Sequence, residues 1–112
     1  MILLLEDNVM VTLPIVELAQ TAGQTVYVAE NASDALTRIC QGGLDGAVFN
    51  MQLATPELIS TALGDLPVAC YGPHVEGEWF TEYRRLGVRE VWPNSKLRVR
   101  LAQWLPQILK SL

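Results

Sequence analysis

Cysteine, histidine and long hydrophobic runs are all scarce in this chain of 112 residues. The two cysteines, Cys40 and Cys70, cannot build a disulfide framework, and their spacing does not match a zinc site. We therefore predict that both are buried thiols in a protein of the reducing cytoplasm. The apolar start at residues 1–5 runs directly into two acidic residues, so it is too short for a signal-peptide core or a membrane span. No membrane partner is expected.

Basic residues are nearly absent from the first 83 positions, which hold eleven acidic residues and one arginine, a net charge of −10. Residues 84–112 hold seven basic residues and one acidic residue, a net charge of +6. The chain is therefore electrically polarised along its length.

A glycine-rich phosphate loop is also missing, because Asp7-Asn8-Val9 follows the first apolar run. Since no nucleophile–base pair is apparent either, the sequence argues against a small enzyme or a nucleotide-binding protein.

The composition is that of a globular protein, with 50% hydrophobic and 18% charged residues, and the length suits one domain over residues 1–112. Short apolar runs alternate with stretches of helical spacing, which predicts alternating strands and helices. The predicted strands are 1–5, 24–29, 46–49, 68–71 and 90–92. The fold class predicted is α/β, a doubly wound, five-stranded parallel sheet in three α/β/α layers.

Capping residues predict where the helices begin. Asn31 predicts a helix over 33–40, and Thr55 predicts a short helix that ends near Leu63. Two later helices are predicted over 77–86 and over 95–109.

Pro14 decides the expected start of the first helix. A proline inside a helix removes a hydrogen bond and clashes with the preceding turn, whereas a proline in the first turn is tolerated. The helix is therefore predicted to start near Thr12 or Leu13 and to end at Gly23.

Polar residues collect where the predicted strands end, which is where sites form in open α/β sheets. They are Glu6-Asp7-Asn8, Glu30, Asn50-Met51, Gly72-Pro73-His74 and Pro93-Asn94-Ser95. With this arrangement the chain resembles, over essentially its whole length, the receiver domain of bacterial response regulators, the chemotaxis-type family. The segments that carry the resemblance are Ile2–Asn8, Gly23–Ala29, Ala35-Leu36, Leu44–Asn50, Leu66–Ala69 and Leu86–Val88. The resemblance implies a flavodoxin-like (βα)5 fold.

The resemblance also implies a phosphorylation site whose parts can be compared position by position. Receivers use an aspartate at the end of the third strand as the nucleophile that accepts a phosphoryl group, and the corresponding residue here is Asn50. A carboxamide oxygen is neutral and poorly nucleophilic, so Asn50 cannot serve as this acceptor. The family's hydroxyl residue, switch aromatic and lysine correspond to Gly72, Val91 and Asn94, so these parts are missing together.

The acidic pair that holds magnesium in the family corresponds to Glu6 and Asp7. We expect no cofactor and no resident metal; weak magnesium binding by these carboxylates stays open, as does a merely solvated loop pair. Three carboxylates and one lysine give the family pocket a charge of −2, and two carboxylates give −2 here. We therefore hypothesise a degenerate pocket that stays folded, catalyses nothing and does not switch between two signalling states.

Aromatic and basic residues gather in the part of the chain that corresponds to helix 4, strand 5 and helix 5 of receivers, a common face for dimers and output binding. The predicted partner-binding residues are Trp79, Tyr83, Arg84, Arg85, Arg89, Trp92, Arg98 and Arg100. The sequence thus predicts a pseudo-receiver of two-component-type signalling and phosphorelay systems, a phosphorylation-independent interaction module. Its expected partner is a protein, such as a signalling kinase, an output protein or a second copy of itself.

Several alternatives stay open from the sequence. The same arginines would suit an anion-binding or nucleic-acid-binding regulator, although the net charge of −4 counts against nucleic acid. A receiver phosphorylated at an unusual residue is another. A further alternative is that Trp79 and Tyr83 pack inside the protein and that the neighbouring arginines are merely solvated, without a partner. We interpret His74 as an incidental loop residue and Cys70 as a core thiol.

Overall fold

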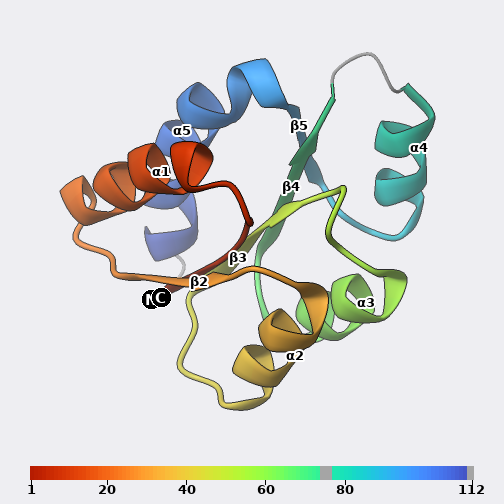
Figure 1. The fold of residues 1–112 in the computed structure, drawn as a ribbon, viewed down its shortest axis with the longest axis horizontal. Helices are drawn as coiled ribbons and strands as arrows, with labels where there is room; N and C mark the ends of the chain where they lie inside the picture. The colour runs from red at the N-terminus through yellow and green to blue at the C-terminus, as the bar shows by residue number, and fades with distance from the viewer. Residues whose placement is uncertain (74–76, 111–112) are drawn as a thin grey trace.

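Five parallel strands form one sheet in the order β2-β1-β3-β4-β5 (Figure 1). The computed structural model describes residues 1–73 and 77–110, so the prediction for His74 lies outside the described residues. The strands are β1 (Ile2–Leu5), β2 (Val26–Ala29), β3 (Gly46–Asn50), β4 (Val68–Gly72) and β5 (Glu90–Pro93). The predicted doubly wound, flavodoxin-like α/β fold is confirmed, with strand boundaries within two residues of the predicted ones.

Helices cover both faces of the sheet (Figure 1). On one face lie α1 (Val9–Thr21) and α5 (Leu97–Lys110), which follows a 3-10 turn (Asn94–Lys96); on the other lie α2 (Ala32–Cys40), α3 (Pro56–Asp65) and α4 (Gly77–Arg85). Because strand side chains alternate between faces, Leu3 and Leu5 pack toward α2 and α3, whereas Ile2 and Leu4 pack toward α1 and α5. Within the described residues, no helix is both long and apolar enough to cross a membrane.

The predicted caps of the two middle helices are present. Asn31 Oδ1 accepts a hydrogen bond from the Asp34 amide at 2.8 Å, and Thr55 Oγ1 accepts one from the Leu58 amide at 3.2 Å. Gly87 has φ of 109°, a conformation that suits glycine, and it follows the end of α4. These local signals act as expected because each satisfies backbone groups that a helix end leaves unpaired.

The first helix begins at Val9 rather than three or four residues later as predicted. Asn8 caps it, since its Oδ1 accepts a hydrogen bond from the Met10 amide at 3.0 Å. Pro14 therefore lies inside the helix and leaves the Met10 carbonyl without its usual partner. Met10 is 74% exposed, so water can satisfy that carbonyl. The Asn8 cap stabilises this helix start, and the access of water to the Met10 carbonyl lowers the free-energy cost of Pro14. The helix therefore tolerates the internal proline.

Cys40 is exposed at the end of α2, so the prediction that it is a buried thiol is wrong. The physical reason is helical periodicity, because Cys40 follows Ile39, which occupies the buried face of the helix. Cys70 in β4 is buried as predicted. Its burial raises the pKa of the Cys70 thiol well above its usual range.

Candidate functional site

Three polar side chains lie in one row across the carboxyl end of the sheet. Asn50 of β3 is the register partner of Tyr71 of β4, and Leu5 of β1 is the register partner of Phe49 of β3. Glu6, the first residue after β1, therefore falls beside Asn50. Neighbouring strands are about 4.8 Å apart, so roughly 10 Å separates the backbones of Glu6 and Tyr71. Two long side chains bridge that gap across β3.

Glu6 is the centre of this row. Its side chain is only 3% exposed, and it is the one buried charged residue among those described. Its Oε1 accepts hydrogen bonds from the Tyr71 hydroxyl at 2.5 Å and from Asn50 Nδ2 at 3.1 Å. Its Oε2 accepts hydrogen bonds from the backbone amides of Asp7 at 3.0 Å and Asn8 at 3.1 Å. Both carboxylate oxygens are therefore fully engaged by donors.

No positively charged side chain balances Glu6 in the described part of the chain. The ion pairs found there join the Met1 ammonium to Asp45 and Arg85 to Glu82. A buried carboxylate is costly unless it is paired with a cation or hydrogen-bonded on all sides. Glu6 meets this requirement through four donors, two from side chains and two from the backbone.

Tyr71 supplies the shortest of these hydrogen bonds. Its side chain is 2% exposed and belongs to the core on the α1 and α5 side of the sheet. Burial, and then the hydrogen bond to Glu6, raise the pKa of the Tyr71 phenol well above its usual range. The phenol therefore stays protonated at physiological pH and acts as a permanent donor to the carboxylate.

Asn50 is oriented by both ends of its amide. Its Nδ2 donates to Glu6 Oε1 at 3.1 Å, and its Oδ1 accepts a hydrogen bond from the Gln52 amide at 2.9 Å. The reverse orientation would place oxygen against carboxylate oxygen, so the network selects the one observed. Asn50 thus presents a donor to the acidic residue and no anionic oxygen to the pocket.

A pocket of about 300 Å³ lies over this row and is lined in part by Asp7, Asn94 and Gln52. Magnesium prefers several oxygen ligands with free lone pairs. Both oxygens of Glu6 already accept hydrogen bonds, and the Asn50 oxygen accepts one from the backbone amide of Gln52. Of these three side chains, only that of Asp7 is exposed and available to a cation. No group of three or more aspartate, glutamate, histidine or cysteine side chains suited to a metal occurs in the described ranges. The residues present do not fit a magnesium site.

Gly72 occupies the position expected for the family's hydroxyl residue, at the end of β4. A Cβ atom built on Gly72 would lie 2.7 Å from Met51 Cε and 3.3 Å from Met51 Cβ. Met51 is itself 3% exposed, so it fills this space from within the core. Only glycine therefore fits at position 72 without a shift of the Met51 side chain.

Val91 and Asn94, the other two residues compared with the receiver family, lie within β5 and directly after it. Val91 of β5 is 6% exposed and packs in the core beside Cys70, its register partner in β4. Asn94 is exposed, begins the 3-10 turn and lines the pocket over the row. Neither residue carries a charge or a switchable aromatic ring into that pocket.

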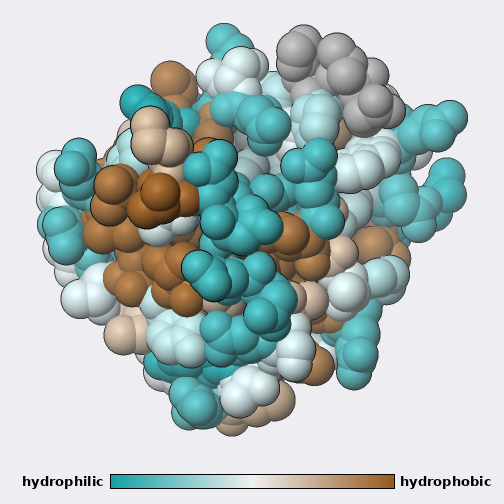
Figure 2. Space-filling model, viewed as in Figure 1, coloured by the Kyte–Doolittle hydropathy of each residue, from teal (hydrophilic) through white to brown (hydrophobic). Residues whose placement is uncertain are grey.

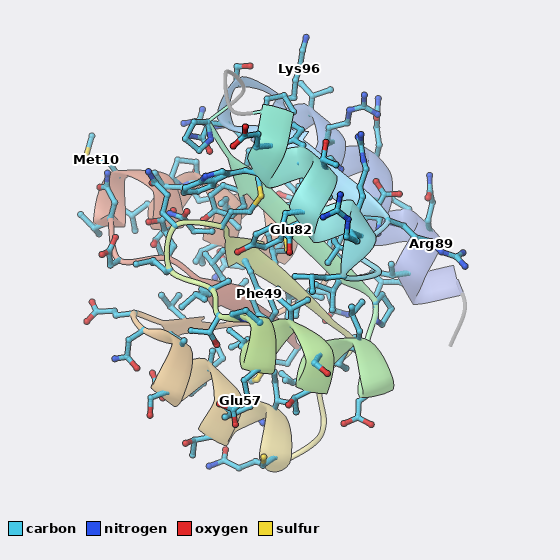
Figure 3. The ribbon with its side chains drawn as sticks, turned by 90° about the vertical axis from the view of Figure 1, so that its right-hand side faces the viewer. Met10, Phe49, Glu57, Glu82, Arg89 and Lys96 are labelled. Carbon is cyan, nitrogen blue, oxygen red and sulfur yellow. The ribbon has the colours of Figure 1, made fainter. Side chains whose placement is uncertain are left out.

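The predicted basic surface is exposed. Arg84, Arg85, Arg89, Arg98 and Arg100 are all exposed to solvent, and Arg85 donates to Glu82 at 3.2 Å on the surface of α4. Arg89 precedes β5 whereas Lys96 follows it, and Figure 3 shows these two side chains projecting from separate places on the molecule. The exposed basic residues are therefore spread over α4, the segment before β5 and α5 rather than gathered in one compact patch, and we call the five arginines the basic band.

The predicted aromatic residues of that surface are largely covered. Trp79 and Tyr83 are half-buried against the core on the α2 and α3 side, and the Tyr83 hydroxyl donates to the Met51 carbonyl at 3.0 Å. The prediction of partner binding is wrong for Trp92, whose side chain is 2% exposed. Its ring packs edge-on against Trp104 at 5.7 Å, and its indole N–H donates to Glu90 at 3.0 Å.

Two surface features were not predicted from the sequence. A pocket of about 540 Å³ lies beside Arg89 at the amino end of β4 and β5, where Leu63, Leu86 and Trp104 contribute apolar walls. At the start of α1, Val9, Met10 and Leu13 are 61%, 74% and 56% exposed, and Figure 2 shows apolar side chains gathered over this helix. The periodic pattern of α1 gives no warning of this surface, because the helix is apolar nearly all round.

Tyr71 is the site residue that sequence reasoning missed. Its position within an apolar run favours a core role, and the ring is indeed buried. The usable signal is positional, because Glu6, Asn50 and Tyr71 each stand at the carboxyl end of a predicted strand. With the strands aligned in register, the three residues fall on one row and on one face of the sheet.

Several solved structures similar to this one are response-regulator receiver domains. The Francisella response regulator 1452 receiver domain matches with a TM-score of 0.84 at 17% identity, over 98% of this chain and 96% of that one. The receiver domain of NtrX from Brucella abortus matches with a TM-score of 0.83 at 18% identity over 100% of both chains. The chain spans 26% of a longer Brucella abortus NtrX chain, with 98% of its own length covered, a TM-score of 0.83 and 19% identity. No protein-family model and no curated protein matches the sequence. The chain therefore has the receiver-domain fold.

Proposed function

We propose that this chain is a pseudo-receiver, a receiver-like domain over residues 1–112 that regulates by binding other proteins and does not use phosphorylation. The observation that carries the proposal is Asn50, a carboxamide held by two hydrogen bonds where a receiver would need an anionic nucleophile. Gly72, Val91 and Asn94 support it, because none can report or counter a phosphoryl charge. On this proposal the protein is a non-enzymatic component of two-component-type signalling in the cytoplasm.

The surface best suited to a partner is the basic band. Five exposed arginines lie in the part of the chain that carries a net charge of +6, and one of them borders an apolar pocket of about 540 Å³. Arginine beside apolar surface is a common composition of binding sites between proteins. The partner chemistry that this favours is an acidic protein segment, such as part of a kinase or an output protein, bound by α4, β5 and α5.

Phosphodonors are expected to leave the protein unchanged. Beryllofluoride or acetyl phosphate, each with magnesium, should not alter the amide NMR spectrum around Asn50, because the site offers no anionic acceptor. A receiver that retains its aspartate, treated in parallel, serves as the control for active reagent. A stable covalent phosphorylation detected by mass spectrometry, at any residue, would contradict the proposal and favour a receiver with an unusual acceptor.

Replacement of Arg84, Arg85 and Arg89 by alanine is expected to abolish capture of the partner in a pull-down with the native chain. Lys96→Ala, an exposed base at the other end of β5, is the matched control and should retain capture. Because the contacts are electrostatic, capture should also weaken as salt rises. Equal capture by the triple variant and wild type would show that another surface is used. Arginine-dependent retardation of nucleic acid would instead favour the nucleic-acid alternative.

A further inference from the structure

The side chains of Glu6, Asn50 and Tyr71 determine whether this end of the sheet can bind a divalent cation. A receiver-like pocket that lost one carboxylate would still keep two, Glu6 and Asp7, beside a carboxamide oxygen. Such a set could in principle hold a divalent cation weakly, because carboxylate and amide oxygens are suitable ligands. What decides the outcome is whether those oxygens are free.

Glu6 Oε1 is the oxygen on which the answer depends. It points into the row, where it accepts hydrogen bonds from the Tyr71 hydroxyl at 2.5 Å and from Asn50 Nδ2 at 3.1 Å. Glu6 Oε2 turns the other way, onto the amides of Asp7 and Asn8. The two backbone donors follow from the shape of the loop. The two side-chain donors, Tyr71 and Asn50, therefore decide whether the Glu6 carboxylate is available to a ligand in the pocket.

Tyr71 differs from Asn50 in what it could offer a cation. The Asn50 amide carries an oxygen as well as a donor, so a rotation would convert it from a donor to a ligand. The Tyr71 phenol has a single hydroxyl group, whose proton is donated to Oε1 at 2.5 Å, and it has no second polar atom that a rotation could turn toward a cation. A short hydrogen bond to a carboxylate is among the stronger ones in proteins, and here it is buried.

We propose that the Tyr71 hydroxyl, reaching across β3 to Glu6, takes the place of a divalent cation and keeps magnesium out of this pocket. Tyr71 is thus a positioning residue, which holds the acidic end of β1 in a single metal-free arrangement. The inference rests on the proposed function, and it adds that binding to partners is independent of magnesium as well as of phosphate. It also explains why a buried acidic residue persists without a positive partner in the described part of the chain.

The experiment compares magnesium binding by wild type, Tyr71→Phe and Tyr83→Phe. Tyr83→Phe is the matched control, because the Tyr83 hydroxyl donates to the Met51 carbonyl and has no contact with Glu6. Magnesium is titrated by calorimetry and by tryptophan fluorescence, since Trp92 is the register partner of Tyr71. Wild type and Tyr83→Phe should show no saturable binding through the millimolar range. Tyr71→Phe should show saturable binding at least about tenfold tighter than the weakest affinity that the titration can detect, equivalent to about 1.4 kcal/mol.

Two results would overturn the inference. One is saturable magnesium binding by wild type with the same affinity as Tyr71→Phe. The other is a folded Tyr71→Phe protein, judged by its amide NMR spectrum, that binds no more tightly than wild type. Should Tyr71→Phe not fold, the wild-type amides of Asp7 and Asn8 decide, because magnesium should not shift them and a saturable shift refutes the inference. The phosphodonor experiment is separate, so magnesium binding without phosphorylation would refute this inference and leave the proposed function standing.

Discussion

Asn50→Asp, which would introduce a carboxylate at this position, is expected to destabilise the protein at neutral pH by about 2–4 kcal/mol. The Asn50 amide donates to Glu6 Oε1 at 3.1 Å, so the substitution would replace a donor by a second anionic oxygen at contact distance. Two carboxylates that share a site cannot both ionise without a large cost, and the pair would take up a proton on folding. A group that binds a proton on folding loses stability as pH rises. The penalty should therefore be larger at pH 7.5 than at pH 4.5.

Urea denaturation in metal-free buffer at these two pH values measures the effect. Asn50→Ala removes the donor without adding charge, so it should cost only about 1–2 kcal/mol and show little pH dependence relative to wild type. Gln52→Glu adds a charge at an exposed position on the rim of the same pocket and should cost little. If Asn50→Asp were as stable as wild type at pH 7.5, this would show that the Glu6 side chain is not a carboxylate stabilised by the donors around it.

Alkaline pH is expected to destabilise the folded protein by about 3–4 kcal/mol between pH 9 and pH 11. The ordinary pKa values are 9.0 for the Cys70 thiol and 10.0 for the Tyr71 phenol, and burial raises both in the folded state. Above those values the unfolded chain loses protons that the folded chain keeps, so stability falls as pH rises. The stability is fully present below pH 9. Burial also raises the pKa of Tyr83 to about 12, but that side chain is less deeply buried than Cys70 and Tyr71 and contributes less.

Chemical denaturation at intervals between pH 8 and pH 11 tests this slope. Cys70→Ala should remove about 2 kcal/mol of the loss, and Tyr71→Phe should remove about 1 kcal/mol. Cys40→Ala is the matched control, because Cys40 is exposed and should leave the slope unchanged. A stability that stays constant up to pH 11 would place both groups in contact with solvent, contrary to the packing around them.

Most of the fold could be predicted from the sequence because the controlling signals are local or periodic. The nearly continuous apolar runs of β1, β3 and β4 favour strands covered on both faces, and Asn31 and Thr55 predict two helix starts that the structure confirms. The predicted start of α1 was wrong because it rested on the rule against internal proline alone, whereas in the structure Asn8 caps the helix and Pro14 lies inside it. In the folded helix the proline leaves a carbonyl that water can reach, which lowers its cost.

The site divides between features that residue identity fixes and features that only the folded chain reveals. Asn50 has no anionic oxygen, Gly72 has no hydroxyl and Asn94 has no charge, and these chemical properties can be read directly from the sequence. The role of Tyr71 depends on sheet register and on a reach of two strands, and no local pattern encodes either. Trp92 shows the opposite error, because a composition typical of interfaces was preferred to its place within an apolar strand.

The close fit between Met51 and Gly72 bears on how such a protein could change over evolutionary time. A hydroxyl-bearing residue at position 72 would meet the Met51 side chain, and an aspartate at position 50 would meet Glu6 while Tyr71 still donates to it. Each of these substitutions therefore requires a neighbouring side chain to adjust. On the proposed function, this chain would gain a phosphoryl-accepting site only if several neighbouring residues changed together, so substitutions at positions 50, 51, 71 and 72 are expected to depend on one another.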